Sequence, residues 1–156
     1  MEEYVLTKLK GCKRVVKLYE TFTDDMNQYF NMEYLSGGEL WELCHSYGLA
    51  SRAEIKYYLY KILLAVQECH AKGIIHRDLK PENIMLNEGR VDLKLIDFAT
   101  SWDFQNTDKK GSGNGSTGRR IYYHFVGTPQ YMPVESFRNQ GSFTSTDVYA
   151  IGCIAY

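Results

Sequence analysis

One segment, residues 76–83, limits what this 156-residue chain can fold into more than any other. It reads His-Arg-Asp-Leu-Lys-Pro-Glu-Asn and separates a helix-like apolar pattern from two short apolar runs that are typical of strands. Pro81 lacks a backbone N–H and does not fit inside a helix, so we expect a loop here. Taken alone, the segment indicates only a polar loop, and its meaning depends on the segments around it.

The elements predicted around this loop mix helices with short strands. The clearest helix begins at Ser51, where Ser51 and Glu54 form a capping box, and it ends at Gly73. Its apolar face consists of Ile55, Leu59, Ile62, Leu63, Val66 and Cys69. Further helices are expected at residues 2–9, 39–44 and 132–138, and strands at residues 15–22, 28–34, 84–86 and 93–96.

Two other stretches bear on how the chain is organised. Residues 105–118 are rich in glycine and small polar side chains, which predicts a flexible insert without a packed core. The chain ends at Tyr156 inside an apolar run that begins near Asp147. We therefore expect a fragment of a longer domain.

Composition and charge exclude several classes of protein. The formal net charge is −1, so no overall basic field favours nucleic acid or an anionic membrane surface. The longest apolar stretches are too short to span a bilayer, and the first residues lack the pattern of a signal peptide. The four cysteines form no C-x-x-C pair, which argues against a zinc site or a disulfide framework. We expect a monomer in the cytoplasm, with no nucleic acid bound and no membrane contact from this segment.

Three more segments follow the polar loop in a fixed order. They are Asp-Phe-Ala at residues 97–99, Gly-Thr-Pro-Gln-Tyr-Met-Pro-Val-Glu at 127–135, and Thr-Asp-Val-Tyr at 146–149. Together with residues 76–83, they resemble the catalytic loop, the magnesium motif, the end of the activation segment and the loop-anchoring aspartate of eukaryotic protein serine/threonine kinases. Residues 72–88, 97–100, 125–131 and 147–156 resemble most the phosphoinositide-dependent kinases of the AGC group.

The resemblance implies a fold and a division of the chain. The fold would be α+β, the bilobal protein-kinase-like architecture, here truncated to a partial small lobe and the upper part of a mainly helical large lobe. Residues 1–35 would form the partial N-lobe. Residues 36–156 would form the partial C-lobe, with the activation segment at residues 97–135.

The resemblance also implies catalytic roles, since phosphoryl transfer requires positioning and charge neutralisation. Asp78 would orient the substrate hydroxyl and accept its proton, and Lys80 would steady the transferring phosphate. Asn83 and Asp97 would hold Mg²⁺, which prefers oxygen ligands. Thr128 would lie beside Asp78 and Lys80. The implied function is transfer of the γ-phosphate of ATP to serine and threonine hydroxyls of protein substrates.

Residues 31–40 resemble the kinase hinge, which binds the nucleotide. Backbone groups of Glu33 and Leu35 would contact adenine, and Glu39 would contact the ribose. Met32 would be the gatekeeper and Met85 the pocket floor, although both side chains also fit plain core packing. Glu82 of the catalytic loop completes the expected nucleotide contacts.

One acidic residue near the start remains ambiguous. Glu2 fits the helix glutamate that pairs with a strand lysine, because Leu6, Leu18, His76 and Phe98 then fall at stacked-spine positions. Glu3 is the competing candidate. No glycine-rich loop precedes either residue. The literal G-x-G-x-x-G at residues 113–118 follows the magnesium motif and is interpreted as a linker.

Several positions depart from the family pattern. Ala99 replaces a glycine, Pro133 and Val134 replace Ala-Pro, and His124 replaces an activating phosphoserine, so we expect no phosphorylation switch at position 124. The changes at Ala99, Pro133 and Val134 give some support to an alternative function, that of a pseudokinase or scaffold that binds nucleotide or partners without transfer. The presence of Asp78, Asn83 and Asp97 favours catalysis. A small-molecule phosphotransferase is disfavoured by residues 127–131, and we expect the isolated 156-residue chain to be poorly stable and inactive.

Overall fold

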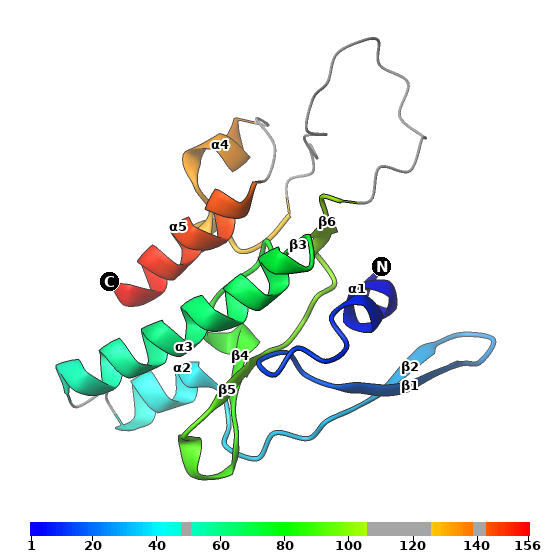
Figure 1. Ribbon diagram of the computed structural model, residues 1–156, viewed down its shortest axis with the longest axis horizontal. Coiled ribbons are helices and arrows are strands. Elements are labelled where there is room, and N and C mark those ends of the chain that lie inside the picture. Colours follow the sequence, from blue (N-terminus) through cyan, green and yellow to red (C-terminus); the bar gives the residue numbers. More distant parts are fainter. Residues whose placement is uncertain (48–50, 106–125, 139–142) are drawn as a thin grey trace.

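The computed structural model describes residues 1–47, 51–105, 126–138 and 143–156 (Figure 1). The helices are α1 (Glu2–Lys8), α2 (Leu40–Glu42), α3 (Arg52–Ala71), α4 (Val134–Phe137) and α5 (Thr144–Ala155), and a π-helical turn, Leu43–Tyr47, continues α2. The strands are β1 (Leu18–Thr23), β2 (Gln28–Met32), β3 (Ile74–Ile75), β4 (Ile84–Leu86), β5 (Leu93–Leu95) and β6 (Trp102–Asp103). Single 3₁₀ turns occur at Pro81–Asn83, Glu88–Arg90 and Pro129–Tyr131. The G-x-G-x-x-G stretch, His124 and all but the first residue of the predicted insert lie outside the described residues.

The strands form three antiparallel pairs: β1 with β2, β3 with β6, and β4 with β5. The predicted strand at 84–86 is confirmed with the same bounds, and those at 28–34 and 93–96 are confirmed with slightly shorter bounds. The first predicted strand begins three residues later than expected, at Leu18. Val15 and Val16 instead pair with β5: Val15 forms a bridge with Leu95, and the Val16 N–H donates to the Leu95 carbonyl at 3.1 Å.

Helix α3 runs through the middle of the molecule, with α5 beside it (Figure 1). Its predicted capping box is present: Ser51 Oγ accepts from the Glu54 N–H at 3.2 Å, and Glu54 Oε2 accepts from the Ser51 N–H at 3.0 Å. Three of the predicted face residues, Ile62, Val66 and Cys69, are buried, whereas Leu63 is half exposed. The cap fixes where the helix begins, and the buried face fixes how it packs.

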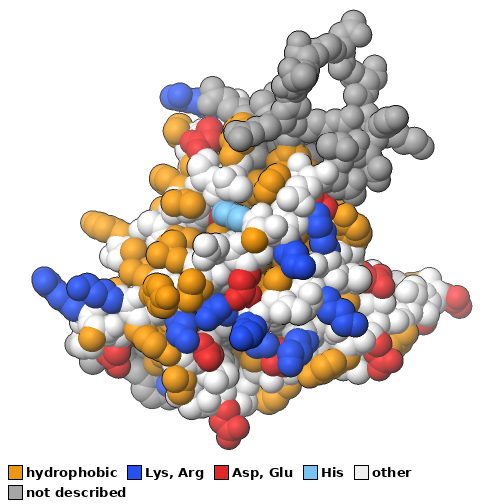
Figure 2. Space-filling model, in the orientation of Figure 1, with side chains coloured by type: hydrophobic (Ala, Val, Ile, Leu, Met, Phe, Trp, Pro, Cys, Tyr) orange, Lys and Arg blue, Asp and Glu red, His pale blue; other side chains and the backbone are white. Residues whose placement is uncertain are grey.

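One apolar cluster joins the described elements. It contains Val5 and Leu6 of α1, Ile62 of α3, Leu95 of β5 and Phe98, each at most 3% exposed. The same cluster includes Ala150 and Ile151 of α5, so residues from both ends of the chain share one core. The mixture of helices and antiparallel strand pairs confirms the predicted α+β class. No helix among the described residues is long and apolar enough to cross a membrane. Figure 2 shows basic and acidic side chains on the same face of the molecule.

Candidate active site

A buried carboxylate binds the backbone at the start of the loop at residues 76–83. Asp147, at the start of α5 and 1% exposed, accepts the backbone N–H groups of His76 at 3.0 Å and Arg77 at 2.9 Å. His70 of α3 approaches the same carboxylate, with Nε2 2.8 Å from Oδ2. Because two of the three partners are backbone groups, Asp147 fixes the path of the loop. The predicted anchoring aspartate thus lies where it can anchor the loop.

The backbone on both sides of the site adopts an uncommon conformation. Arg77 and Asp97 have φ values of 70° and 59°, in the left-handed region that non-glycine residues rarely occupy. Gly127 has φ 108°, and a Cβ atom there would lie 2.5 Å from the Arg77 carbonyl oxygen. Such conformations persist only where surrounding contacts enforce them, and they gather at functional sites.

Asp78 lies at the centre of a polar cluster. Its Oδ1 accepts the Thr128 N–H at 2.8 Å and the Thr128 hydroxyl at 2.7 Å, and its Oδ2 lies 3.2 Å from Lys80 Nζ. Lys80 also donates to Thr128 Oγ1 at 2.9 Å. Asn83 Nδ2 donates to the Asp78 carbonyl at 2.9 Å and to Oδ2 at 3.2 Å. The structure therefore brings together a carboxylate, a cation, a hydroxyl and a carboxamide that are spread over 51 residues of sequence.

This environment keeps Asp78 ionised. Burial by itself would raise the pKa of the carboxyl, but the hydrogen bonds from Thr128 and the charge of Lys80 outweigh it and lower the pKa below the ordinary value. Asp78 is therefore a hydrogen-bond acceptor at neutral pH.

Asn83 and Asp97 offer a donor set that suits Mg²⁺. Both bonds of the Asn83 amide to Asp78 use Nδ2, which leaves Oδ1 as the oxygen that could face a cation. Asp97 is exposed, and its Oδ1 accepts the Ala99 N–H at 3.3 Å. No group of three or more His, Cys, Asp or Glu residues that could hold a metal occurs among the described residues. Two protein oxygens fit Mg²⁺, since it is commonly bound by one or two protein ligands together with substrate phosphates and water.

A cavity of about 370 Å³ adjoins Asp97 and contains most of the predicted nucleotide contacts. Its walls include Met32, Glu33, Leu35, Met85 and Asp97. The Glu33 N–H donates to the Lys17 carbonyl at 2.9 Å. Of the two Glu33 backbone groups, the carbonyl is therefore the one that could bind an adenine ring.

Two predicted nucleotide contacts lie outside this cavity wall. Glu39 precedes α2 and forms a bridge with Met85, and Glu82 has a buried Oε2 without a hydrogen bond from any described residue.

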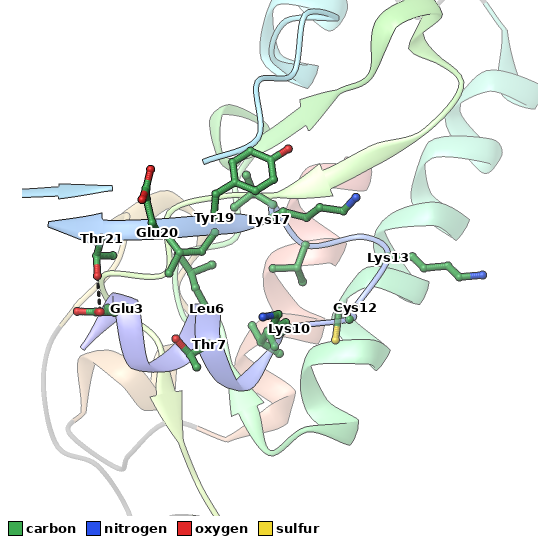
Figure 3. Close-up of a pocket in the computed structure, with 15 residues that line it drawn as sticks. Glu3, Leu6, Thr7, Lys10, Cys12, Lys13, Lys17, Tyr19, Glu20 and Thr21 are labelled. Atoms are coloured by element: carbon green, nitrogen blue, oxygen red, sulfur yellow. Dashed lines mark hydrogen bonds between the residues drawn. The ribbon is translucent and has the colours of Figure 1, made fainter. Parts of the chain in front are cut away.

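The structure distinguishes between the two candidate acidic residues of α1. Glu2 lines the 370 Å³ cavity, and its Oε1 accepts the Phe98 N–H at 3.1 Å. Glu3 instead accepts hydrogen bonds from Thr21 and Gln28 of the β1–β2 hairpin. Figure 3 shows Glu3 bonded to Thr21 in a groove between α1 and β1. That groove, of about 610 Å³, is the larger cavity, but none of the residues that surround Asp78 lines it.

The two described departures from the family pattern are accommodated locally. Ala99 is not among the described residues with positive φ, so a glycine is not needed there in this conformation. Pro133, with φ −72°, occupies the N-cap position of α4, and Met132 before it is extended, as a residue before proline prefers. Neither change disturbs the Asp78 cluster.

Sequence patterns did not reveal two polar partners of the site. Lys94 of β5 forms an ion pair with the Glu33 carboxylate at 2.6 Å, which ties the predicted hinge to the strand that leads to Asp97. His70 reaches Asp147 from α3. Neither residue belongs to a short motif, and the only available signal was that each polar side chain falls in a largely apolar element.

Comparison with known proteins gives consistent matches over the whole chain. Residues 1–156 match the family described as protein kinase domain. Serine/threonine-protein kinase PKH3 of Eremothecium gossypii is 38% identical over 143 residues, which cover 91% of this chain and 19% of that protein. Human 3-phosphoinositide-dependent protein kinase 1 is 38% identical over 141 residues, which cover 90% of this chain and 24% of that protein.

A third relative is matched over the full chain. Serine/threonine-protein kinase PKH2 of Saccharomyces cerevisiae is 35% identical over 156 residues, 100% of this chain and 14% of that protein. The chain thus spans no more than about a quarter of the length of these three relatives.

Proposed function

This chain belongs to the protein kinase domain family, and we propose that it transfers the γ-phosphate of ATP to serine and threonine hydroxyls of protein substrates. The names of its relatives support this substrate class, since they include two serine/threonine-protein kinases and a phosphoinositide-dependent protein kinase. The cluster of Asp78, Lys80, Asn83 and Thr128 is the single observation that carries the proposal.

Asp78 is proposed to receive the substrate hydroxyl. Its carboxylate already accepts the hydroxyl of Thr128 at 2.7 Å, which is the kind of contact that a substrate hydroxyl would make. Because the pKa of Asp78 is lowered, the carboxylate orients the hydroxyl first and accepts its proton as the phosphate is transferred.

The negative charge of the phosphates is proposed to be neutralised by Lys80 and by Mg²⁺ bound to Asn83 and Asp97. Lys80 lies 3.2 Å from the Asp78 carboxylate, so its cation would offset charge on the transferring group. Asn83 and Asp97 would hold Mg²⁺ through their oxygens, and the bound ion neutralises charge on the β- and γ-phosphates. Met32, Glu33, Leu35 and Met85 would enclose the adenine in the cavity beside Asp97.

The test compares two aspartate variants of the protein at its natural length. Asp78→Asn keeps the shape of the side chain and removes its charge, whereas Asp92→Asn alters an exposed aspartate that pairs with Lys61. With Mg²⁺, ATP and serine/threonine peptides, we expect Asp78→Asn to lower kcat about 10²- to 10⁴-fold. Asp92→Asn should stay within about twofold, because surface pairs contribute little.

The alternative, a pseudokinase or scaffold, predicts a different result. A well-folded natural-length protein that binds ATP but transfers no phosphate would support the scaffold function. Transfer that survives in Asp78→Asn would instead keep the enzyme but reject the role assigned to Asp78.

A further inference from the structure

A second polar cluster lies outside the residues assigned to transfer. Tyr4 and Lys8 are four residues apart on α1, and both reach Oδ2 of Asp103, at 2.7 Å from the Tyr4 hydroxyl and 2.6 Å from Lys8 Nζ. Oδ1 of Asp103 accepts the Gln105 N–H at 2.9 Å. Asp103 is 4% exposed, so a buried carboxylate is held by two side chains of one helix and one backbone group.

Asp103 is fixed to the segment that presents Asp78. It belongs to β6, where it pairs with Ile74 of β3, and β3 leads directly into the loop at residues 76–83. Phe104, the next residue, donates its N–H to the Gly73 carbonyl at 2.9 Å. The carboxylate thus marks a rigid position relative to the catalytic loop.

The partners of Asp103 lie on the helix that carries Glu2. Val5 and Leu6 bury the core side of α1, at 0% and 3% exposure, while Tyr4 and Lys8 extend from an adjacent face toward Asp103. At the start of the same helix, Glu2 Oε1 accepts the Phe98 N–H, and Phe98 directly follows Asp97. Helix α1 therefore forms hydrogen bonds with residues 97–105 at two places: Glu2 binds the Phe98 N–H, and Tyr4 and Lys8 bind Asp103.

We propose that Asp103 is a positioning residue for phosphoryl transfer: through Lys8 and Tyr4 it holds α1 in the orientation that keeps Glu2 on Phe98 and Asp97 in place. The effect of Asp103 on phosphoryl transfer rests on the proposed function. Its effect on the orientation of α1 does not depend on that function. Removing one partner of a buried ion pair lowers stability, so Asp103→Asn is expected to change both the local geometry and the stability, and the test must measure the geometry directly.

Amide hydrogen exchange tests the geometry directly. In Asp103→Asn of the natural-length protein, we expect the Phe98 amide to exchange at least tenfold faster, because Glu2 no longer stays within reach. The Leu95 amide, which donates to the Arg14 carbonyl at 2.9 Å only three residues away, should change less than twofold. Lys61→Met, which breaks an exposed pair of the same 2.6 Å length at Asp92, should change neither amide.

A double variant separates the cluster from a general loss of packing. Lys8→Met and Asp103→Asn remove the same ion pair, so Lys8→Met/Asp103→Asn should accelerate Phe98 exchange no more than the stronger single variant. Equal acceleration at Phe98 and Leu95 would overturn the proposal in favour of a purely structural pair. Unchanged Phe98 exchange would overturn it as well.

Kinetics then link the cluster to transfer. Asp103→Asn should lower kcat/KM for ATP about tenfold and leave KM for the peptide within twofold, since Asp97 faces the nucleotide cavity. An unchanged kcat/KM for ATP in an active enzyme would contradict a positioning role. If the natural-length protein transfers no phosphate, the proposed function fails, while Phe98 exchange still decides whether Asp103 positions α1.

Discussion

Asp78 and Asp147 are both buried carboxylates, but Asp147 is bound mainly by backbone groups and Asp78 mainly by side chains. Asp147 accepts backbone N–H groups of His76 and Arg77, which cannot leave without unfolding the loop. Asp78 accepts side-chain and backbone groups of Thr128 and the cation of Lys80. The first arrangement suits a fixed support, and the second suits a carboxylate that can exchange one hydroxyl partner for another.

Gly127 is the residue that allows Thr128 to reach Asp78, and its replacement gives a clear prediction. Gly127→Ala must place a Cβ 2.5 Å from the Arg77 carbonyl, whereas Gly11→Ala has a similar φ of 93° but open space around it. We expect both to be destabilised by the φ strain, by about 1 kcal/mol. Gly127→Ala should lose about 1–3 kcal/mol more and reduce transfer, because the close contact adds further strain. Urea unfolding of both variants measures the difference, and equal losses would show that the approach to Arg77 does not matter.

At the scale of elements, the sequence predicted those helices and strands whose formation depends on residues close together in the chain. The cap of α3 and the strands β4 and β5 were predictable because their signals lie within a few residues of sequence. The two-residue strands β3 and β6 were not, since each exists only through its pairing with the other, 28 residues away. Val15 and Val16 are residue types that favour strands, but they pair with β5 instead of β2, so β1 begins after them.

The cap of α3 provides a test at this scale. Ser51→Ala removes the oxygen that accepts the Glu54 N–H and should lower the free energy of unfolding by about 1 kcal/mol. Ser51→Asp restores an acceptor and should recover the loss to within about 0.5 kcal/mol. Chemical denaturation measures both variants. An aspartate variant as unstable as the alanine variant would mean that the cap does not stabilise α3.

At the scale of the whole molecule, the candidate site was predictable where it follows a linear motif. Asp78, Lys80, Asn83 and Asp97 belong to such motifs, and the structure places the first three in one cluster. Asp103 and Lys8 are 95 residues apart and belong to no motif, so only the folded structure, in which α1 side chains reach β6, could reveal their pairing.

The pH dependence of stability follows from these carboxylates. Burial alone would raise the pKa of Asp103, but the hydrogen bonds from Lys8 and Tyr4 outweigh it and lower the pKa. A group with a lowered pKa in the folded state stabilises the fold above its unfolded pKa, about 3.9 for aspartate, and this contribution is lost as the pH falls through the folded value. At pH 6, Asp103→Asn should therefore be less stable than the unaltered protein by about 1–3 kcal/mol.

That difference should shrink as the pH falls from about 4 toward 2, because the unaltered carboxyl then becomes neutral as well. Urea unfolding at pH 6, 4 and 3 measures it. A difference that stays constant over this range would show that Asp103 acts through packing alone. A difference that closes only on the acid side would tie the stability of the α1–β6 contact to its charge, and therefore to the same ion pair that is proposed to hold Glu2 on Phe98.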